Sequence, residues 1–180
     1  MKKLIIAAAL AMIALPSYAS SLPDAEIAQK FSVSTGPSLA VDFKVSPRAS
    51  LGASVGSPLY RGFFASGLYD VRFLYKFVNE GKFAVSGLIG AAGNPGFNNG
   101  YGYPIGVEAG VAMSFKFTPE FTGRLNLVGS VPFAGSANYD FFRFVAPSSG
   151  IEIGYRFNRT FELTLGGNGQ GDVLGLNVHF

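Results

Sequence analysis

The feature that most constrains this chain is an alternation of apolar and polar residues with a period of two. From Ile105 to Phe117 every odd position is apolar, and every even position is small or polar. Successive side chains of a β-strand point to opposite faces of its sheet, so the pattern predicts a strand with one apolar and one polar face. A further strand is expected at Lys30–Thr35. The pattern recurs in nine segments, which are 39–45, 51–55, 69–77, 83–90, 105–117, 121–131, 151–157, 161–165 and 174–180.

The connections between these segments alternate between two lengths. Two tight connections, 36–38 and 166–170, fall on the side of the longer ones. Such alternation is typical of an antiparallel up-and-down β-barrel, with both chain ends at the short-turn end when the strand number is even. We therefore expect ten strands, with eight as the alternative. The short connections are 46–48, 78–81, 118–120 and 158–159, and the longer ones are 58–66, 93–103 and 132–149.

The composition indicates which solvent surrounds the barrel. Charged residues make up 14% of the chain, whereas soluble domains carry about 25%. There is no Cys, so disulfides cannot stabilise the fold, but a closed barrel in lipid satisfies every backbone group. We therefore expect an all-β transmembrane barrel of a bacterial outer membrane. The alternative, a soluble barrel or sandwich, would bury its apolar face. It is disfavoured because the polar face is rich in Gly, Ala and Ser, and the aromatic residues are too many for a small interior.

The N-terminus has the three parts of a secretory signal peptide. A charged start, Met1–Lys3, precedes an apolar run from Leu4 to Leu15, and a small-residue cleavage site ends at Ala19. The run is shorter than the ~20 apolar residues of a spanning helix. We expect a signal peptide at 1–19 and an exported barrel domain at 20–180, with a retained N-terminal anchor as the alternative. The formal charge of +3 includes Lys2 and Lys3, so removing both leaves +1. No basic cluster suited to nucleic acid remains.

Aromatic residues of the apolar face gather at two heights. One group adjoins the short turns and the C-terminus, as expected for an aromatic girdle at one membrane interface. A second group adjoins the longer loops. The first consists of Phe43, Phe77, Phe83, Phe117, Phe121, Phe157 and Phe161, with Phe180 at the chain end, and the second of Tyr69, Tyr101, Tyr103, Phe133, Tyr139, Phe141 and Phe142.

The polar face carries six basic and five acidic residues, a nearly balanced set. Balanced charges inside a narrow barrel favour paired networks that close the interior, and the interior of a small barrel is mostly filled by side chains. The alternative is the selectivity lining of a small diffusion pore. The expected network comprises Asp42, Asp70, Arg72, Glu108, Arg124, Glu152, Arg156 and Glu162, and Lys44, Lys76 and Lys116 complete the set.

No constellation of catalytic residues is found in the sequence. The only histidine is His179, which is expected in the lumen at the short-turn end. A general base must reach its proton at hydrogen-bond distance, and a metal needs several ligands; the sequence supplies no partners nearby. We expect no enzyme activity, no metal and no cofactor. A lipid-modifying enzyme is the third hypothesis, after a structural or interaction barrel and a diffusion pore.

The C-terminal segment ends in an aromatic residue that follows apolar residues at alternate positions. Leu176, Val178 and Phe180 resemble the assembly signal of Gram-negative outer-membrane barrels. Such a signal implies recognition by the barrel-assembly machinery through strand pairing. Apart from that machinery, outer-membrane lipid is the expected partner, and the barrel is expected to be a monomer.

The chain also resembles the YfaZ-like family of small outer-membrane β-barrel proteins. The run Glu152-Ile-Gly-Tyr-Arg156 and the ending Asn177-x-x-Phe180 carry most of the resemblance. The family implies a ten-stranded, porin-like barrel and brings no catalytic residues. The regions that resemble it best are 108–117, 121–127, 151–157 and 175–180.

Overall fold

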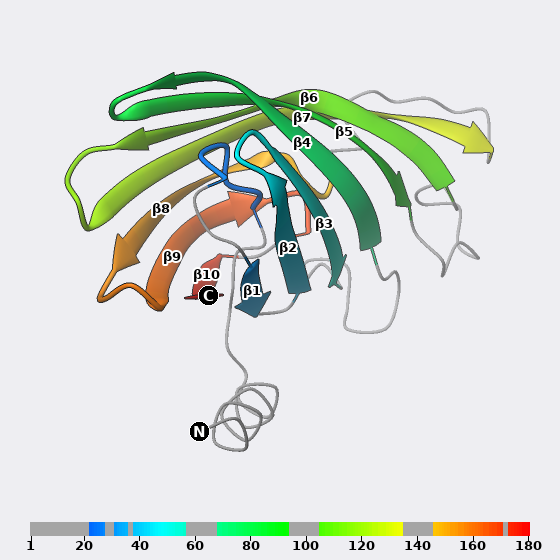
Figure 1. The fold of residues 1–180 in the computed structure, drawn as a ribbon. Coiled ribbons are helices and arrows are strands. Elements are labelled where there is room, and N and C mark those ends of the chain that lie inside the picture. Colours follow the sequence, from blue (N-terminus) through cyan, green and yellow to red (C-terminus); the bar gives the residue numbers. More distant parts are fainter. Residues whose placement is uncertain are drawn as a thin grey trace.

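A computed structural model describes residues 22–27, 31–35, 38–56, 68–93, 105–134, 146–170 and 173–180. Within these ranges the chain forms ten β-strands that curl into a barrel (Figure 1). The strands are β1 (Phe31–Thr35), β2 (Ser38–Ser46), β3 (Ala49–Gly56), β4 (Leu68–Glu80), β5 (Phe83–Gly93), β6 (Ile105–Lys116), β7 (Phe121–Ala134), β8 (Gly150–Arg156), β9 (Phe161–Asn168) and β10 (Leu174–His179).

The barrel is closed by pairing between its first and last strands. Each strand pairs with its neighbours in the sequence, and β1 pairs with β10 through the register Val33–Val178. All ten pairings are antiparallel. The prediction of a ten-stranded up-and-down barrel is therefore confirmed, and the eight-stranded alternative is wrong. No helix within the described ranges is long and apolar enough to cross a membrane.

The two faces of the sheet have opposite polarity, and the apolar face is the outer one. In β7 the inward residues Arg124 and Asn126 are 3% and 1% exposed, whereas the outward residues Leu125 and Leu127 are 38% and 60% exposed. The other strands repeat this division, because adjacent strands are in register and their side chains alternate. The barrel thus has an apolar exterior and a charged interior, the reverse of a soluble barrel.

Several strand ends differ from the predicted segments; β4 continues to Glu80 and β5 to Gly93. The loop predicted at 132–149 begins later, because β7 continues to Ala134 and includes Pro132. Among the described residues, β8 accompanies β7 only as far as Asn126, and proline is tolerated where a strand lacks a neighbour on one side. The connection predicted at 166–170 is shorter as well, since β9 extends to Asn168. The predicted signal peptide and most of the longer loops lie outside the described residues.

The predicted girdle phenylalanines all lie on the outside of the barrel at the short-turn end. Their exposed fractions run from 37% for Phe83 to 57% for Phe77 and Phe157. Neighbouring rings touch around this end, with centroids 4.8 Å apart for Phe31 and Phe43. Of the second aromatic group, Phe133 is described and is 70% exposed, and Tyr69 is half-buried. Tyr101, Tyr103, Tyr139, Phe141 and Phe142 lie outside the described residues.

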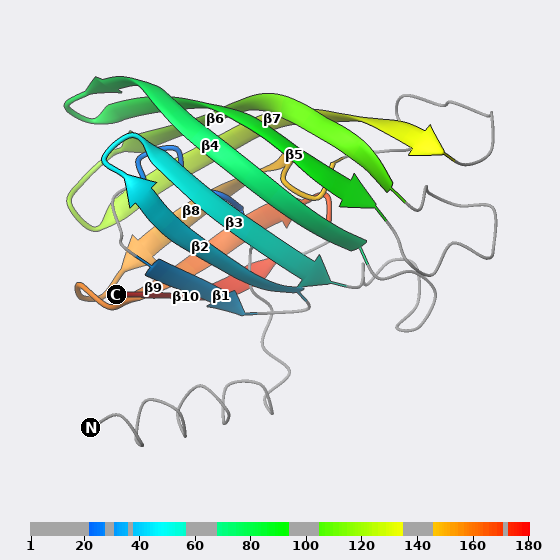
Figure 2. The same cartoon turned by 45° about the vertical axis from the view of Figure 1, so that its right-hand side comes forward.

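The wall of the barrel is not equally high all round. Strands β4 to β7 contain 11 to 14 residues each. On the opposite side, β8, β9, β10 and β1 contain 7, 8, 6 and 5 residues. Figure 2 shows the two sides together, with the long strands β4–β7 reaching farther to the right of the view than the short orange, red and blue ones.

Candidate functional site in the barrel lumen

A short segment of the chain, residues 22–27, lies inside the barrel and is called the plug segment here. Its apolar side chains are buried, with Leu22 and Ile27 5% exposed and Ala25 fully buried. Ala25 and Ile27 pack in one apolar cluster with lumen-facing side chains of the tall wall, among them Leu74 and Leu88. The lumen is therefore filled by backbone as well as by side chains.

Backbone carbonyls of the plug segment are held by side chains of the long strands. The Asn126 amide donates to the Pro23 carbonyl over 3.0 Å, and the Ser86 hydroxyl donates to the Ala25 carbonyl over 2.7 Å. The Lys76 ammonium donates to the Glu26 carbonyl over 2.7 Å. Buried carbonyls without such donors would be costly. The polar face of β4, β5 and β7 thus provides the hydrogen bonds that a sheet neighbour would otherwise supply.

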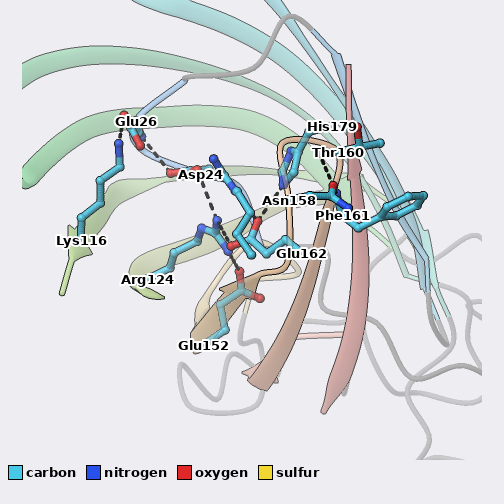
Figure 3. A network of polar contacts seen from close by, with 11 residues as sticks. Asp24, Glu26, Lys116, Arg124, Glu152, Asn158, Thr160, Phe161, Glu162 and His179 are labelled. Atoms are coloured by element: carbon cyan, nitrogen blue, oxygen red, sulfur yellow. Dashed lines mark hydrogen bonds and ion pairs between the residues drawn. The ribbon is translucent and has the colours of Figure 1, made fainter. Parts of the chain in front are cut away.

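Two ion pairs tie the plug segment to the wall. Glu26 lies 2.5 Å from the Lys116 ammonium, and Asp24 lies 3.4 Å from the Arg124 guanidinium. Figure 3 shows both pairs, with Asp24 pointing toward the centre of a larger charge network. The Glu26–Lys116 pair is partly exposed, so we expect it to contribute at most about 1 kcal/mol.

The Arg124 cluster lies at the short-turn end, directly against the plug segment. Arg124 donates to Glu152 over 2.6 Å and to Glu162 over 2.8 Å. The other oxygen of Glu162 lies 2.7 Å from His179 Nε2 and 3.7 Å from Arg156. Arg124, Glu152 and Glu162 are buried to 3% exposure or less. Three strands, β7, β8 and β9, therefore place one guanidinium between two carboxylates in the middle of the lumen (Figure 3).

The Arg72 cluster lies nearer the long-loop end. Arg72 on β4 pairs with Asp70 over 2.9 Å and with Asp42 on β2 over 3.0 Å. Ser148 donates to Glu108 over 2.9 Å and also reaches Asp70 over 3.4 Å. Arg72, Asp70 and Glu108 are at most 1% exposed. One guanidinium thus serves two carboxylates directly, and a loop serine links a third acid to the group.

Residues of β3 and of two connections complete the Arg72 cluster near the long-loop end. Ser54 donates to Asp70 over 2.5 Å, and the Gln170 amide donates to Ser54. Ala146, Ser148 and Gln170 are fully buried although they follow or precede loops. Buried residues therefore occupy the lumen at both ends, with the plug segment at one end and these three residues at the other.

Glycines facing the lumen make room for both clusters. A Cβ at Gly52 would overlap the Asp42 carboxylate and lie 2.9 Å from Arg72 Nε. A Cβ at Gly154 would overlap the Glu162 carboxylate and lie 3.1 Å from Arg124 Nη1. Gly52 and Gly154 are thus places where charged side chains from neighbouring strands cross the lumen.

The space left beside the plug segment is small. A cavity of about 40 Å³ lies between Leu22, Ile27 and the walls of β1, β2 and β10. Asn177 and His179 line it, and their Oδ1 and Nδ1 atoms are buried without a hydrogen-bond partner among the residues that the structure describes. A water molecule needs roughly 10–15 Å³ of such space and two to four polar partners. The cavity therefore fits one or a few waters, and it is too small for a transported solute.

The structure brings all eight predicted lumen charges inside the barrel, but as two clusters. Asp42, Asp70, Arg72 and Glu108 form one, and the remaining four form the other, with Arg156 half-buried at its edge. His179 occupies the predicted place at the short-turn end. Of the predicted assembly-signal residues on and after β10, Val178 is buried, Leu176 is half-buried and Phe180 is exposed. Among the described residues, no group of His, Cys, Asp and Glu is arranged to hold a metal ion.

Sequence reasoning missed the plug segment with Asp24 and Glu26, and it missed the contributions of Ser148 and Gln170. One signal was available for the plug segment. The predicted lumen set has one more basic than acidic residue, and a buried excess of positive charge calls for acids from elsewhere. Asp24 and Glu26, which precede the first strand in the sequence, meet that need.

Comparison with protein-family models, with curated proteins and with solved structures gave no match to this chain.

Proposed function

We propose that this protein is an integral β-barrel of a bacterial outer membrane, with a closed lumen and a structural or interaction role. The observation that carries the proposal is the polarity of the barrel. Large apolar side chains such as Leu127, Val131 and Ile151 are 60% or more exposed on the outside, while charged residues fill the inside.

The apolar exterior supports a lipid environment on physical grounds. Soluble monomers rarely expose contiguous apolar patches beyond a few hundred Å². Here exposed large apolar side chains lie on each strand from β2 to β10, and Phe31 and Val33 of β1 are half-buried beside them. In hydrocarbon the same apolar surface faces an apolar solvent. The closed barrel also leaves no strand edge whose backbone groups lack hydrogen bonds.

The closed lumen favours a non-conducting barrel over a diffusion pore. The plug segment, the Arg124 cluster and the Arg72 cluster follow one another along the lumen, and the cavity beside the plug segment measures about 40 Å³. A hydrated ion needs a continuous polar path. The pairing of buried charges argues for closure as well, because a carboxylate held by a guanidinium is not available to a passing ion.

A lipid-modifying enzyme receives less support. His179 is buried, lies at the short-turn end and contacts Glu162. A catalytic base for lipid would need to reach the substrate at hydrogen-bond distance from a membrane interface. We therefore assign His179 to the lumen network and propose no enzyme activity.

Orientation and export follow from the same proposal. The short turns would face the periplasm and the longer loops the outside, as in other outer-membrane barrels. Export through the N-terminal signal, assembly through Leu176, Val178 and Phe180, a monomeric state and membership of the YfaZ-like family belong to the proposal. Phe180 is half exposed at the end of β10, where a partner strand could reach it.

Two measurements test the proposal. Heat-modifiable gel mobility of membrane-extracted protein should show a compact unheated form and a slower boiled form, because closed barrels resist detergent until heated. Recordings in planar bilayers should show no reproducible conductance steps. A stable unit conductance would support the pore alternative instead, and the absence of a mobility shift would count against a closed membrane barrel.

A Phe180→Ala variant tests the proposed assembly signal. It changes no lumen contact, and it should lower the assembled fraction in cells.

A further inference from the structure

The apolar belt of the barrel differs in height between its two sides. On β6, outward apolar residues extend from Ile105 to Phe117, and both end residues are exposed. On β9, the corresponding belt reaches only from Phe161 to Leu165, after which Gly166, Gly167 and Asn168 complete the strand. β10 carries its belt from Leu174 to Phe180.

Strand geometry turns these spans into heights. A strand rises ~3.3 Å per residue, so the β6 belt is ~40 Å long and the β9 belt ~13 Å long. Strands of membrane barrels tilt by about 40°, which gives axial heights of ~30 Å and ~10 Å, with ~15 Å for β10. The apolar band of an outer-membrane barrel is about 25 Å tall. The β6 side therefore matches a full bilayer, and the β9–β10–β1 side is roughly 10–15 Å too short.

The difference arises at the long-loop end. At the short-turn end, Phe121 begins β7 and Phe161 begins β9, each directly after a short turn, and both belong to the aromatic girdle there. At the other end, β9 turns at Gly169 and Gln170, and the Gln170 side chain enters the lumen. β1 and β2 are likewise joined within three residues, between Thr35 and the paired Leu39. The short apolar belt of the β9–β10–β1 side, called the low side, thus arises at the long-loop end of the barrel. The aromatic girdle at the short-turn end lies at the same height on both sides.

We propose that the β9–β10–β1 side is a surface for thinned bilayer, so that the outer leaflet dips toward the periplasmic ring beside it. This inference rests on the proposed membrane location. A strand too short for the bilayer is accommodated by local thinning, at a cost of fractions of a kcal/mol per Å. Lipids on this side have their acyl chains compressed or splayed, whereas those along β6 and β7 keep their full extension. The activity implied is a local perturbation of lipid packing at the seam between the first and last strands.

Single tryptophans can measure this depth difference, because the chain has no Trp of its own. Leu165→Trp and Leu125→Trp form a matched pair: each residue lies on the outside, four positions after a ring phenylalanine, on strands that run in the same direction. In a bilayer of uniform thickness both lie at the same depth. The full-length barrel is reconstituted in phosphatidylcholine vesicles that contain lipids brominated at shallow or deep chain positions.

The proposal predicts different quenching profiles for the two variants. Trp at 125 should be quenched most by deep bromines, whereas Trp at 165 should lose most of its deep quenching and respond to shallow bromines. Equal profiles would overturn the thinning and leave the membrane location standing. Absence of lipid quenching at both positions would overturn the membrane location itself. Quenching at 125 without any at 165 would mean that protein, such as a second copy of the chain, covers the low side, and this too would overturn the proposal.

Discussion

The Arg72 and Arg124 clusters both pair buried carboxylates with a guanidinium, but their other members differ. Each places one buried guanidinium between two carboxylates from different strands. In the Arg72 cluster the third acid, Glu108, is reached through Ser148. In the Arg124 cluster, Glu162 has two further cationic or polar neighbours, His179 and Arg156. Among the described residues, the first cluster therefore contains one cation, Arg72, whereas the negative charge of the second is shared among several partners.

This contrast has a structural consequence for the lumen. The wall and loop residues alone complete the Arg72 cluster, whereas the Arg124 cluster also holds Asp24 of the plug segment. The lumen near the long-loop end is thus filled by residues of the barrel wall and its loops, whereas near the short-turn end it is also filled by the plug segment. The two ends should respond differently to substitutions.

The largest effect is expected from Arg72→Met. It leaves Asp42 and Asp70 without their cation in a buried site, and breaking a buried pair on one side costs about 3–5 kcal/mol. We expect a loss near the upper end of that range in the free energy of unfolding, measured by urea titration of barrels refolded in vesicles. Arg72→Lys should recover only part of the loss, because an ammonium cannot make the paired contacts of a guanidinium.

Arg124→Met should cost less, near the lower end of about 3–5 kcal/mol. Glu162 keeps His179 and Arg156 as neighbours after the substitution, and Asp24 is partly solvated. The same urea titration gives the comparison. If Arg124→Met destabilised the barrel more than Arg72→Met, the idea that the second cluster shares its charge would be wrong.

A smaller effect is expected where a methyl group enters the Arg124 cluster. Gly154→Ala places a Cβ against the Glu162 carboxylate, and overpacking of this kind costs about 1–3 kcal/mol. Gly129→Ala on the outside of β7 is the matched control, since a Cβ there meets nothing within 4 Å. Equal unfolding midpoints for the two variants would show that the lumen beside the Glu162 carboxylate has room for a methyl group.

The smallest change in stability is expected from loosening the plug segment. Asp24→Asn with Glu26→Gln removes both ion pairs, at a cost of about 1 kcal/mol for partly exposed pairs. Local opening of the plug segment should nevertheless become roughly fivefold more frequent, because that factor corresponds to the lost ion-pair free energy. Ala25→Cys reports this opening by its reaction rate with a maleimide, because the chain has no other cysteine and Ala25 is fully buried. An unchanged rate would mean that backbone hydrogen bonds and packing alone hold the segment.

Much of this architecture could be predicted from the sequence, because a period of two assigns each residue to a face. The alternation from Ile105 to Phe117 placed β6 within one residue and oriented Glu108 inward. Lumen charges on other strands were assigned in the same way. The short turns beside the ring phenylalanines established which strand ends lie together.

Other features depend on information that periodicity does not carry. The division of the charges into two clusters follows from register, which sets Arg124 opposite Glu152 across β7 and β8. The plug segment is six residues long and has no strand pattern, so only its two acids marked it. Pro132 lies in β7, which extends beyond its described pairing with β8. The sequence of a single strand does not show where the neighbouring strand ends.

The outer face of the barrel is proposed to lie in lipid. Spin labels at Leu125, Leu127, Gly129 and Val131 on β7 test it directly, with Glu120 in a short turn as the exposed control. In reconstituted vesicles, the four β7 labels should collide readily with oxygen and hardly with a water-soluble nickel chelate, and the label at Glu120 should behave in the opposite way. Nickel accessibility on β7 equal to that at Glu120 would contradict the claim.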